Sequence, residues 1–158
     1  MAVELPAVPG SYLLWLELAA PTELMVGRLG RFRLPAGHYG YCGSACGPGG
    51  LAARVGRHLR GGGARHWHVD HLRAAAPVRE VWWSLGAVPD EHQFAAALAS
   101  GRGVAVGVPR FGASDCRCPS HLYHSARRPS LAAFRRRLAA AGAAPARLHR
   151  YLPLEKPT

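Results

Sequence analysis

The sequence is short of acidic residues and almost without lysine. Its 158 residues contain 20 Lys and Arg against 9 Asp and Glu, a formal net charge of +11 with His neutral. Lys156 is the single lysine, so arginine carries nearly all of the positive charge. This balance favours a polyanionic partner such as nucleic acid, because each neutralised phosphate releases counterions. A codon composition biased toward Ala, Gly, Arg and Pro is the competing explanation.

Long apolar segments are also missing. No apolar run approaches the roughly 20 residues that a membrane helix needs, so we expect no membrane partner. The N-terminus has no basic segment followed by an apolar core, so we expect no signal peptide and a cytoplasmic protein. The 4 cysteines form two close pairs, Cys42 with Cys46 and Cys116 with Cys118. Reduced thiols or a metal site are favoured over a disulfide framework.

Hydrophobic periodicity and turn residues predict an α/β fold of the α+β type. The expected strands are 11–18, 31–34, 38–42, 78–85 and 104–108. The expected helices are 51–59, 93–99 and a basic helix between an N-cap at Ser130 and a stop at Gly142. The composition changes beyond Arg127. We therefore divide the chain into a domain at 1–125 and a basic C-terminal helix and tail at 126–158, either docked on that domain or loosely tethered.

Five side chains occur in an order that suits phosphodiester hydrolysis. Tyr12 lies on the first strand, Tyr41 ends a later strand, Arg54 and His58 share one face of the next helix, and Glu91 begins another helix. A tyrosine whose pKa is lowered by positive charge can relay a proton. An arginine fits two phosphate oxygens, and one carboxylate can hold one Mg²⁺ or Mn²⁺.

Two strand tyrosines on their own are better explained as core aromatics. Arg54 and Glu91 in register with them favour the catalytic interpretation instead. The tryptophans Trp15, Trp82 and Trp83 are expected in the core, with Trp82 and Trp83 on opposite faces of their strand.

These residues resemble the GIY-YIG nuclease superfamily, and over residues 10–123 the chain is most similar to its Uri-type endonuclease branch. Ser11 and Cys42 depart from the superfamily pattern, but neither supplies the chemistry. Five blocks are similar to the branch: Gly40-Tyr41-Cys42-Gly43-Ser44-Ala45, Gly49-Gly50-Leu51-Ala52-Ala53-Arg54, Arg57-His58, His66-Trp67-His68-Val69-Asp70-His71-Leu72, and Phe111-Gly112-Ala113-Ser114-Asp115-Cys116-x-Cys118-x2-His121-Leu122.

The resemblance implies a small mixed sheet of about three core strands flanked by helices, and DNA cleavage with one divalent cation, Mg²⁺ or Mn²⁺. It places Tyr12 and Tyr41 in the site, Arg54 at the scissile phosphate and Glu91 on the metal. His92, which follows that glutamate, is expected outside the coordination sphere. Either tyrosine can be the general base. Tyr41 is favoured, with His58 as a helper or a substitute base.

We therefore expect an endonuclease acting on DNA, including single-stranded or structured DNA in repair or recombination. A nucleic-acid-binding module that keeps the fold without catalysis is the first alternative. A zinc-dependent hydrolase is the second. The sequence leaves the preferred DNA structure and the oligomeric state open.

The histidine-rich block has two explanations. If it is extended, His66, His68 and Asp70 share one face and can ligate a metal or line a substrate channel. The other explanation is a hydrogen-bonded structural network beside the active site.

The second cysteine pair also has two explanations. Cys116, Cys118 and His121 are three soft ligands within six residues, whereas structural zinc needs four. The candidates for the fourth ligand are His66, His68 and His124. Buried thiols in an ordered loop are the favoured explanation.

Arginines outside the core pattern are candidates for DNA contact. We expect Arg57 beside the site, and Arg135 and Arg136 on the C-terminal helix, to bind phosphates independently of base sequence. A solvated basic helix face is the alternative for the C-terminal pair.

Overall fold

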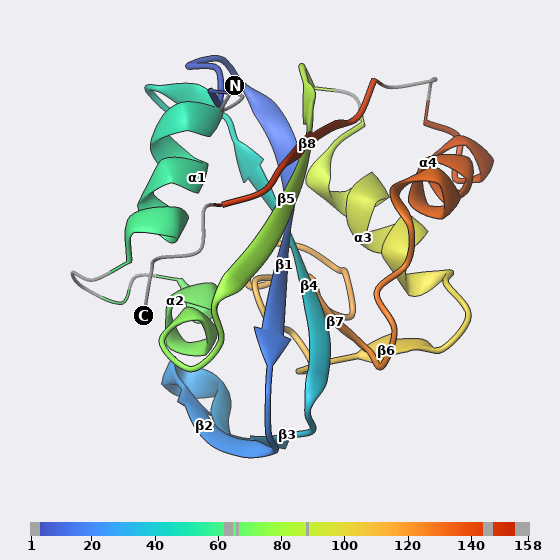
Figure 1. The fold of residues 1–158 in the computed structure, drawn as a ribbon. Helices are drawn as coiled ribbons and strands as arrows, with labels where there is room; N and C mark the ends of the chain where they lie inside the picture. The colour runs from blue at the N-terminus through green and yellow to red at the C-terminus, as the bar shows by residue number, and fades with distance from the viewer. Residues whose placement is uncertain (1–3, 62–64, 66, 88, 144–146, 154–158) are drawn as a thin grey trace.

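An antiparallel sheet of 6 strands runs through the computed structural model of the protein, with helices on both faces (Figure 1). The structure describes residues 4–61, 65, 67–87, 89–143 and 147–153. The strands of this sheet are β1 (Gly10–Leu18), β4 (Gly37–Ala45), β5 (Val78–Leu85), β6 (Val104–Val106), β7 (Leu122–Ser125) and β8 (His149–Tyr151). Their order across the sheet is β6-β7-β4-β1-β5-β8. β2 (Thr22–Val26) and β3 (Gly30–Leu34) form a separate pair, joined by the short helix η1 (Gly27–Leu29).

β1 lies in the centre because its residues are apolar on both sides. It pairs with β4 on one edge and β5 on the other, as expected for a strand with an almost continuous apolar run. Successive side chains point to opposite faces. Tyr12 and Leu14 therefore enter one core, whereas Leu13 and Trp15 enter the other.

Two helices cover each face of the sheet (Figure 1). α1 (Gly50–Arg60) and α2 (His68–Arg73) pack over the Tyr12 face through apolar residues such as Leu51 and Val69. α3 (Glu91–Ala99) and α4 (Leu131–Ala140) pack over the opposite face through residues such as Phe94 and Phe134. The N-cap predicted at Ser130 is present, since its hydroxyl accepts a hydrogen bond from the Ala133 amide at 3.1 Å.

The predicted α+β class is confirmed, and two details of the sheet differ from the prediction. The sheet has 6 strands rather than about three, and each pairing between described strands is antiparallel rather than mixed. β6 lies within the strand expected at 104–108, whereas β7 and β8 were not expected, because their 4 and 3 residues are too few to show a clear alternation. No helix in the described part of the chain has the length and apolar character needed to cross a membrane.

The C-terminal segment is docked rather than loosely tethered, as far as residue 153. β8 pairs with β5, and α4 contributes to the second core. Glu80 of β5 is only 1% exposed and forms ion pairs with Arg128 at 2.6 Å and with Arg150. Its carboxylate also accepts a hydrogen bond from Trp82 Nε1 at 2.7 Å. A buried carboxylate between two arginines therefore fastens both ends of this segment to the sheet.

Candidate active site

Tyr12, His58 and Asp70 form a buried row of polar groups between the sheet and helices α1 and α2. The Tyr12 hydroxyl oxygen lies 3.0 Å from His58 Nε2. On the other side of the ring, His58 Nδ1 lies 3.9 Å from Asp70 Oδ1. The three residues are 1%, 1% and 2% exposed. The carboxylate favours the tautomer with the proton on Nδ1, which leaves Nε2 free to accept the hydroxyl proton.

The backbone around Tyr12 leaves room for its ring. Gly43 of β4 is the register partner of Tyr12 on β1. A Cβ atom at Gly43 would lie 2.4 Å from both Cζ and the hydroxyl oxygen of Tyr12, which is far inside van der Waals contact. The tyrosine ring can therefore lie over β4 and reach His58 only because residue 43 has no side chain.

Asp70 is fixed by several donors. Its carboxylate accepts a hydrogen bond from the Trp67 backbone amide at 3.0 Å, which caps the start of α2. Arg57 and Arg73 lie 3.5 and 3.7 Å from it. These partners hold a carboxylate that is nearly inaccessible to water, so that its position behind His58 is constant.

Burial determines the protonation of these groups. It lowers the pKa of His58 to about 4, against the opposing charge of Asp70, so His58 is neutral at pH 7. Burial also raises the pKa of Tyr12 and of Tyr41, and the nearby Arg54 guanidinium reduces the increase without reversing it. The lowered tyrosine pKa anticipated from the sequence is therefore absent, and both hydroxyls carry their protons.

Tyr41, Arg54 and Glu91 lie close to this row. The Tyr41 ring centroid is 6.4 Å from that of Tyr12 and 6.3 Å from that of His58. Burial raises the pKa of both tyrosines and of Glu91, and in each case the nearby positive charge of Arg54 opposes the increase. Glu91 is partly buried, with 28% of its side chain exposed, and burial raises its pKa. The structure thus brings together all five residues that the sequence assigned to catalysis and metal binding.

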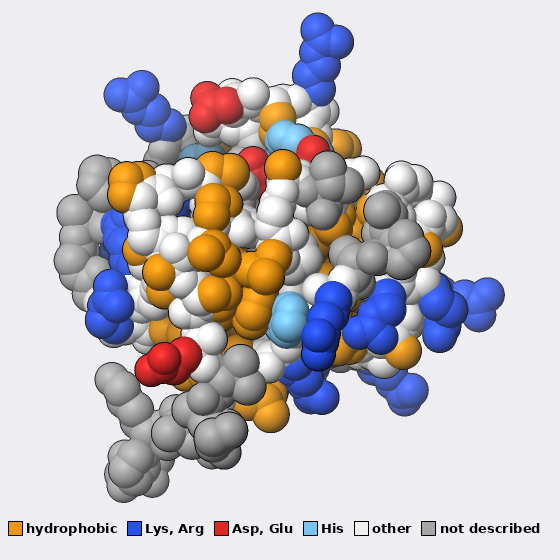
Figure 2. Space-filling model, turned by 90° about the horizontal axis from the view of Figure 1, so that it is seen from above, with side chains coloured by type: hydrophobic (Ala, Val, Ile, Leu, Met, Phe, Trp, Pro, Cys, Tyr) orange, Lys and Arg blue, Asp and Glu red, His pale blue; other side chains and the backbone are white. Residues whose placement is uncertain are grey.

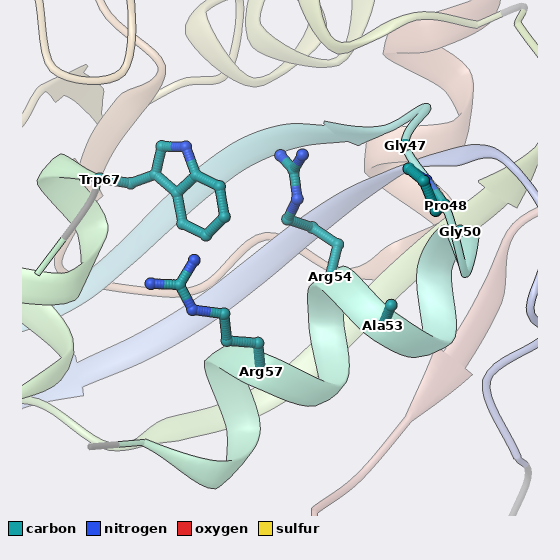
Figure 3. A pocket seen from close by; sticks show the side chains of 7 residues that line it. All are labelled: Gly47, Pro48, Gly50, Ala53, Arg54, Arg57 and Trp67. Carbon is teal, nitrogen blue, oxygen red and sulfur yellow. The ribbon is translucent and has the colours of Figure 1, made fainter. Parts of the chain in front are cut away.

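An open pocket lies beside these residues (Figure 3). Arg54 and Arg57 extend from α1 toward the Trp67 indole, with their guanidinium carbons 4.5 and 4.2 Å from the ring centroid. Arg54 also donates a hydrogen bond to the Ser44 carbonyl at 3.1 Å. The pocket has a volume of about 210 Å³ and is lined by Gly47, Pro48, Gly50, Ala53, Arg54, Arg57 and Trp67. Two cations at its wall suit it for an anion.

The histidine-rich block is helical rather than extended. Val69 and Leu72, three residues apart, both face the first core, and the Asp70 cap starts the helix at His68. His68 Nδ1 accepts a hydrogen bond from the Gly112 amide at 2.8 Å. This contact supports a structural network beside the site. His66 lies outside the described residues.

Arg135 and Arg136 are not part of this group of residues. Both are exposed on α4, and α4 packs on the face of the sheet opposite to α1. Figure 2 shows Arg side chains projecting from several edges of one face and gathering along one of them. Phosphate contacts made by Arg135 and Arg136 would therefore lie on the opposite side of the sheet from α1.

A second group of polar side chains lies at the start of α3. His92, Cys116, Cys118 and His121 place one nitrogen or sulfur atom each within 4.8 Å of one another. Four such residues could hold a metal ion. The sequence identified three of them and missed His92. The proposed alternatives are engaged elsewhere: His68 bonds to Gly112, and His124 Nε2 lies 3.0 Å from the Ala36 carbonyl oxygen.

This second group touches the first. The Oε2 atom of Glu91 lies 3.6 Å from Nδ1 of His121. His121 is 1% exposed, and burial lowers its pKa to about 4. Glu91 therefore connects the Tyr12 site to the group of His92, Cys116, Cys118 and His121.

Comparison with known proteins identifies the family. Residues 11–143 match the family described as Domain of unknown function DUF123. No curated protein and no solved structure matches the chain. The matched segment extends from β1 through α4, so it contains every residue of the two groups above. The chain therefore belongs to the DUF123 family.

Proposed function

We propose that the protein is a divalent-cation-dependent endonuclease that hydrolyses DNA phosphodiester bonds, as its resemblance to the GIY-YIG superfamily implies. The observation that carries the proposal is the buried Tyr12–His58 hydrogen bond at 3.0 Å, with Arg54 and Glu91 near enough to shift the pKa of Tyr12. Proton transfer, phosphate binding and cation binding are the three tasks of phosphodiester hydrolysis. The site contains a group for each task.

Tyr12 and His58 would move the proton. As the oxygen of water bonds to phosphorus, the bond to the 3′ oxygen breaks and that oxygen takes a proton from solvent, while a proton of the attacking water passes to Tyr12. The Tyr12 proton passes at the same time to His58 Nε2, and Asp70 stabilises the resulting imidazolium. This route needs no tyrosinate, so it agrees with the raised pKa of Tyr12. It assigns the general base to Tyr12 rather than to Tyr41, because Tyr12 holds the hydrogen bond to His58.

Glu91 would hold the cation. Its partly exposed carboxylate is the hard oxygen ligand that Mg²⁺ and Mn²⁺ prefer, and a single carboxylate suffices for Mg²⁺, which keeps most of its waters. When bound, the ion supplies charge compensation at the phosphate.

Arg54 and Arg57 would hold the phosphate backbone. Both guanidinium groups lie against Trp67 at the wall of the open pocket (Figure 3). Contact with an indole orients a guanidinium group, whose planar set of N–H donors matches phosphate oxygens. Contacts of this kind position a nucleic acid without reading its sequence.

A cleavage panel tests the proposal. Single-stranded, duplex, flapped and branched DNA would be incubated with the full chain and Mg²⁺, Mn²⁺ or a chelator. We expect cation-dependent cleavage of at least one substrate by the wild type and its loss in Glu91→Gln. Glu17→Gln is the matched control, since Glu17 pairs with Arg79 at the surface. If Glu91→Gln cleaves with Mg²⁺ like the wild type, the site assignment is wrong. If the wild type binds these DNAs and cleaves none, the chain is a binding module.

A further inference from the structure

We propose that His92, Cys116, Cys118 and His121 bind one structural zinc ion, and that the bound ion fixes the position of Glu91 through His121. The zinc site stands on its own geometry and chemistry. Only its connection to Glu91 bears on the proposed function.

The distances fit tetrahedral zinc. Bonds of about 2.3 Å to sulfur and about 2.0 Å to nitrogen place neighbouring ligand atoms about 3.3 to 3.8 Å apart. His92 Nδ1 lies 3.3 Å from Cys118 Sγ, and Cys116 Sγ lies 3.4 Å from His121 Nε2. Two of the six edges of the tetrahedron thus have the required length. No two ligand atoms of the group are more than 4.8 Å apart. A shift of about 1 Å in the ligand atoms therefore completes the coordination.

The ligand chemistry selects zinc over Mg²⁺. Two thiolates and two neutral imidazoles form a soft donor set that Mg²⁺ avoids and zinc prefers. On binding, the two cysteine thiols release their protons to solvent, and two thiolates balance the charge of Zn²⁺. Four protein ligands fill the tetrahedron and leave no position for a water molecule, which is typical of structural sites. The site therefore does not support a zinc-dependent hydrolase.

The loop between β6 and β7 holds the two cysteines in place without using their sulfur atoms. The Arg110 guanidinium donates to the carbonyl oxygens of Cys116 and Cys118, each at 2.7 Å, and to that of Ala113. The His121 amide donates to the Phe111 carbonyl at 2.8 Å. Because the backbone is fastened by these bonds, both sulfur atoms remain available for a metal.

His121 connects this site to Glu91. Its Nε2 faces Cys116. Its Nδ1 is buried, forms no hydrogen bond with the described residues, and lies 3.6 Å from Glu91 Oε2. With Nε2 on zinc, Nδ1 carries the proton and presents it to the carboxylate 3.6 Å away. A carboxylate behind a metal-bound histidine fixes the ring and is itself fixed. His92, adjacent to Glu91 on the first turn of α3, supplies a second connection.

The alternative is a loop with two reduced thiols and no metal. Metal analysis of the purified full chain distinguishes the two, independently of any cleavage assay. We expect one zinc per chain in the wild type, and a cobalt-substituted form with the d–d absorption of tetrahedral sulfur–nitrogen coordination. Cys118→Ser and His92→Ala should lose zinc to a chelator that leaves the wild type loaded. Cys46→Ser and His38→Ala should retain it, because neither residue belongs to the group.

A second variant covers the case in which Cys118→Ser fails to fold. His92→Cys replaces one nitrogen ligand by a thiolate, so zinc should be retained and the thiolate-to-cobalt absorption should rise by about half. Glu91→Ala should weaken zinc binding by about 10- to 100-fold, as loss of a carboxylate behind a ligand histidine does. A wild type that binds neither zinc nor cobalt overturns the site. Unchanged zinc affinity in Glu91→Ala overturns the connection alone.

Discussion

The Tyr12 hydroxyl oxygen and His58 Nε2 lie 3.0 Å apart in a region where both side chains are 1% exposed. Because so little of either side chain is open to solvent, the bond persists in the resting protein. Asp70 on the far side of the imidazole sets its direction, with the hydroxyl donating and the ring accepting. The pair is thus ready to move a proton from the sheet side of the site toward α1.

Removing either partner of this pair should reduce DNA cleavage strongly. General acid–base groups contribute about 100- to 10,000-fold to rate, so we expect Tyr12→Phe and His58→Gln each to lower kcat by at least about 100-fold. Tyr39→Phe is the matched control, since it also removes a buried tyrosine's hydrogen-bonded hydroxyl, here bonded to the Pro35 carbonyl. Single-turnover cleavage assays measure the effect. A cleaving Tyr12→Phe with wild-type kcat would contradict the proposed proton route.

His58 should also make folding stability depend on pH. Its pKa is about 4 in the folded protein and about 6.5 when unfolded, so between these values the unfolded chain binds more protons. Stability is therefore full above pH 6.5 and falls as the pH decreases toward 4, by up to about 3 kcal/mol from this residue. Urea denaturation of the wild type and His58→Gln over this range measures the difference. Equal slopes in the two proteins would contradict the burial of a neutral imidazole.

Arg54→Lys should distinguish the effect of the planar guanidinium group from the effect of positive charge at this position. Lysine keeps the positive charge but loses the planar fork, the Trp67 contact and the bond to the Ser44 carbonyl. We expect kcat to fall by about 100- to 1,000-fold, as on loss of one transition-state donor, with a smaller change in DNA affinity. Arg57→Lys is the comparison, and this substitution should mainly weaken DNA affinity. Equal effects of the two substitutions on kcat would argue against a distinct role for Arg54.

Gly43→Ala should disturb Tyr12 from across the sheet. The added methyl group meets the tyrosine ring at 2.4 Å, and such overpacking costs about 1 to 3 kcal/mol. Gly47→Ala is the stability control, because nothing lies within 4 Å of a Cβ atom there. Gly43→Ala should therefore unfold at a lower temperature than Gly47→Ala in thermal denaturation, and it should cleave DNA more slowly than the wild type. A fully active and stable Gly43→Ala would mean that the Tyr12 ring can be accommodated elsewhere.

Glu80→Gln should loosen the C-terminal segment. Breaking a buried ion pair costs about 3 to 5 kcal/mol, and the partial exposure of Arg128 and Arg150 places the expected loss at the lower end. Glu17→Gln, which breaks the exposed pair with Arg79, should cost no more than about 1 kcal/mol. Denaturant unfolding and limited proteolysis measure both. A Glu80→Gln protein as stable as Glu17→Gln would show that the carboxylate does not anchor this segment.

The long elements could be predicted from the sequence because their patterns are local. The apolar run of β1, the amphipathic face of α1 and the cap of α4 each depend on neighbours in the chain. α2 was harder, because alternation of His and apolar residues in a short segment fits a strand as well as a helix. Its capping bond from Trp67 to Asp70 decides between them. β8 forms by pairing with β5, which is distant in the sequence. The residues around β8 therefore do not predict it.

The same distinction applies to the site. An ordered sequence pattern is enough to predict that five side chains lie near one another, namely Tyr12, Tyr41, Arg54, His58 and Glu91; their catalytic roles stay a prediction. The fourth ligand of the cysteine group could not, since His92 is 26 residues from Cys118 and its neighbourhood offers no ligand spacing. The one local indication in the sequence is that His92 follows Glu91. That position suggests a relation to the Mg²⁺ or Mn²⁺ expected at Glu91, and not to the cysteines. The role of Asp70 behind His58 likewise required the packing of α2 against α1.

The shortness of the two outermost strands has a consequence for solubility at high concentration. β6 and β8 have 3 residues each, whereas the inner strands β1 and β4 have 9. A long, flat outer strand offers unpaired amides and carbonyls with which a strand of another chain can pair. Short outer strands offer few such groups. Because the ion pairs of Glu80 hold the segment that carries β8, a buried carboxylate also shields part of the β5 edge from intermolecular strand pairing.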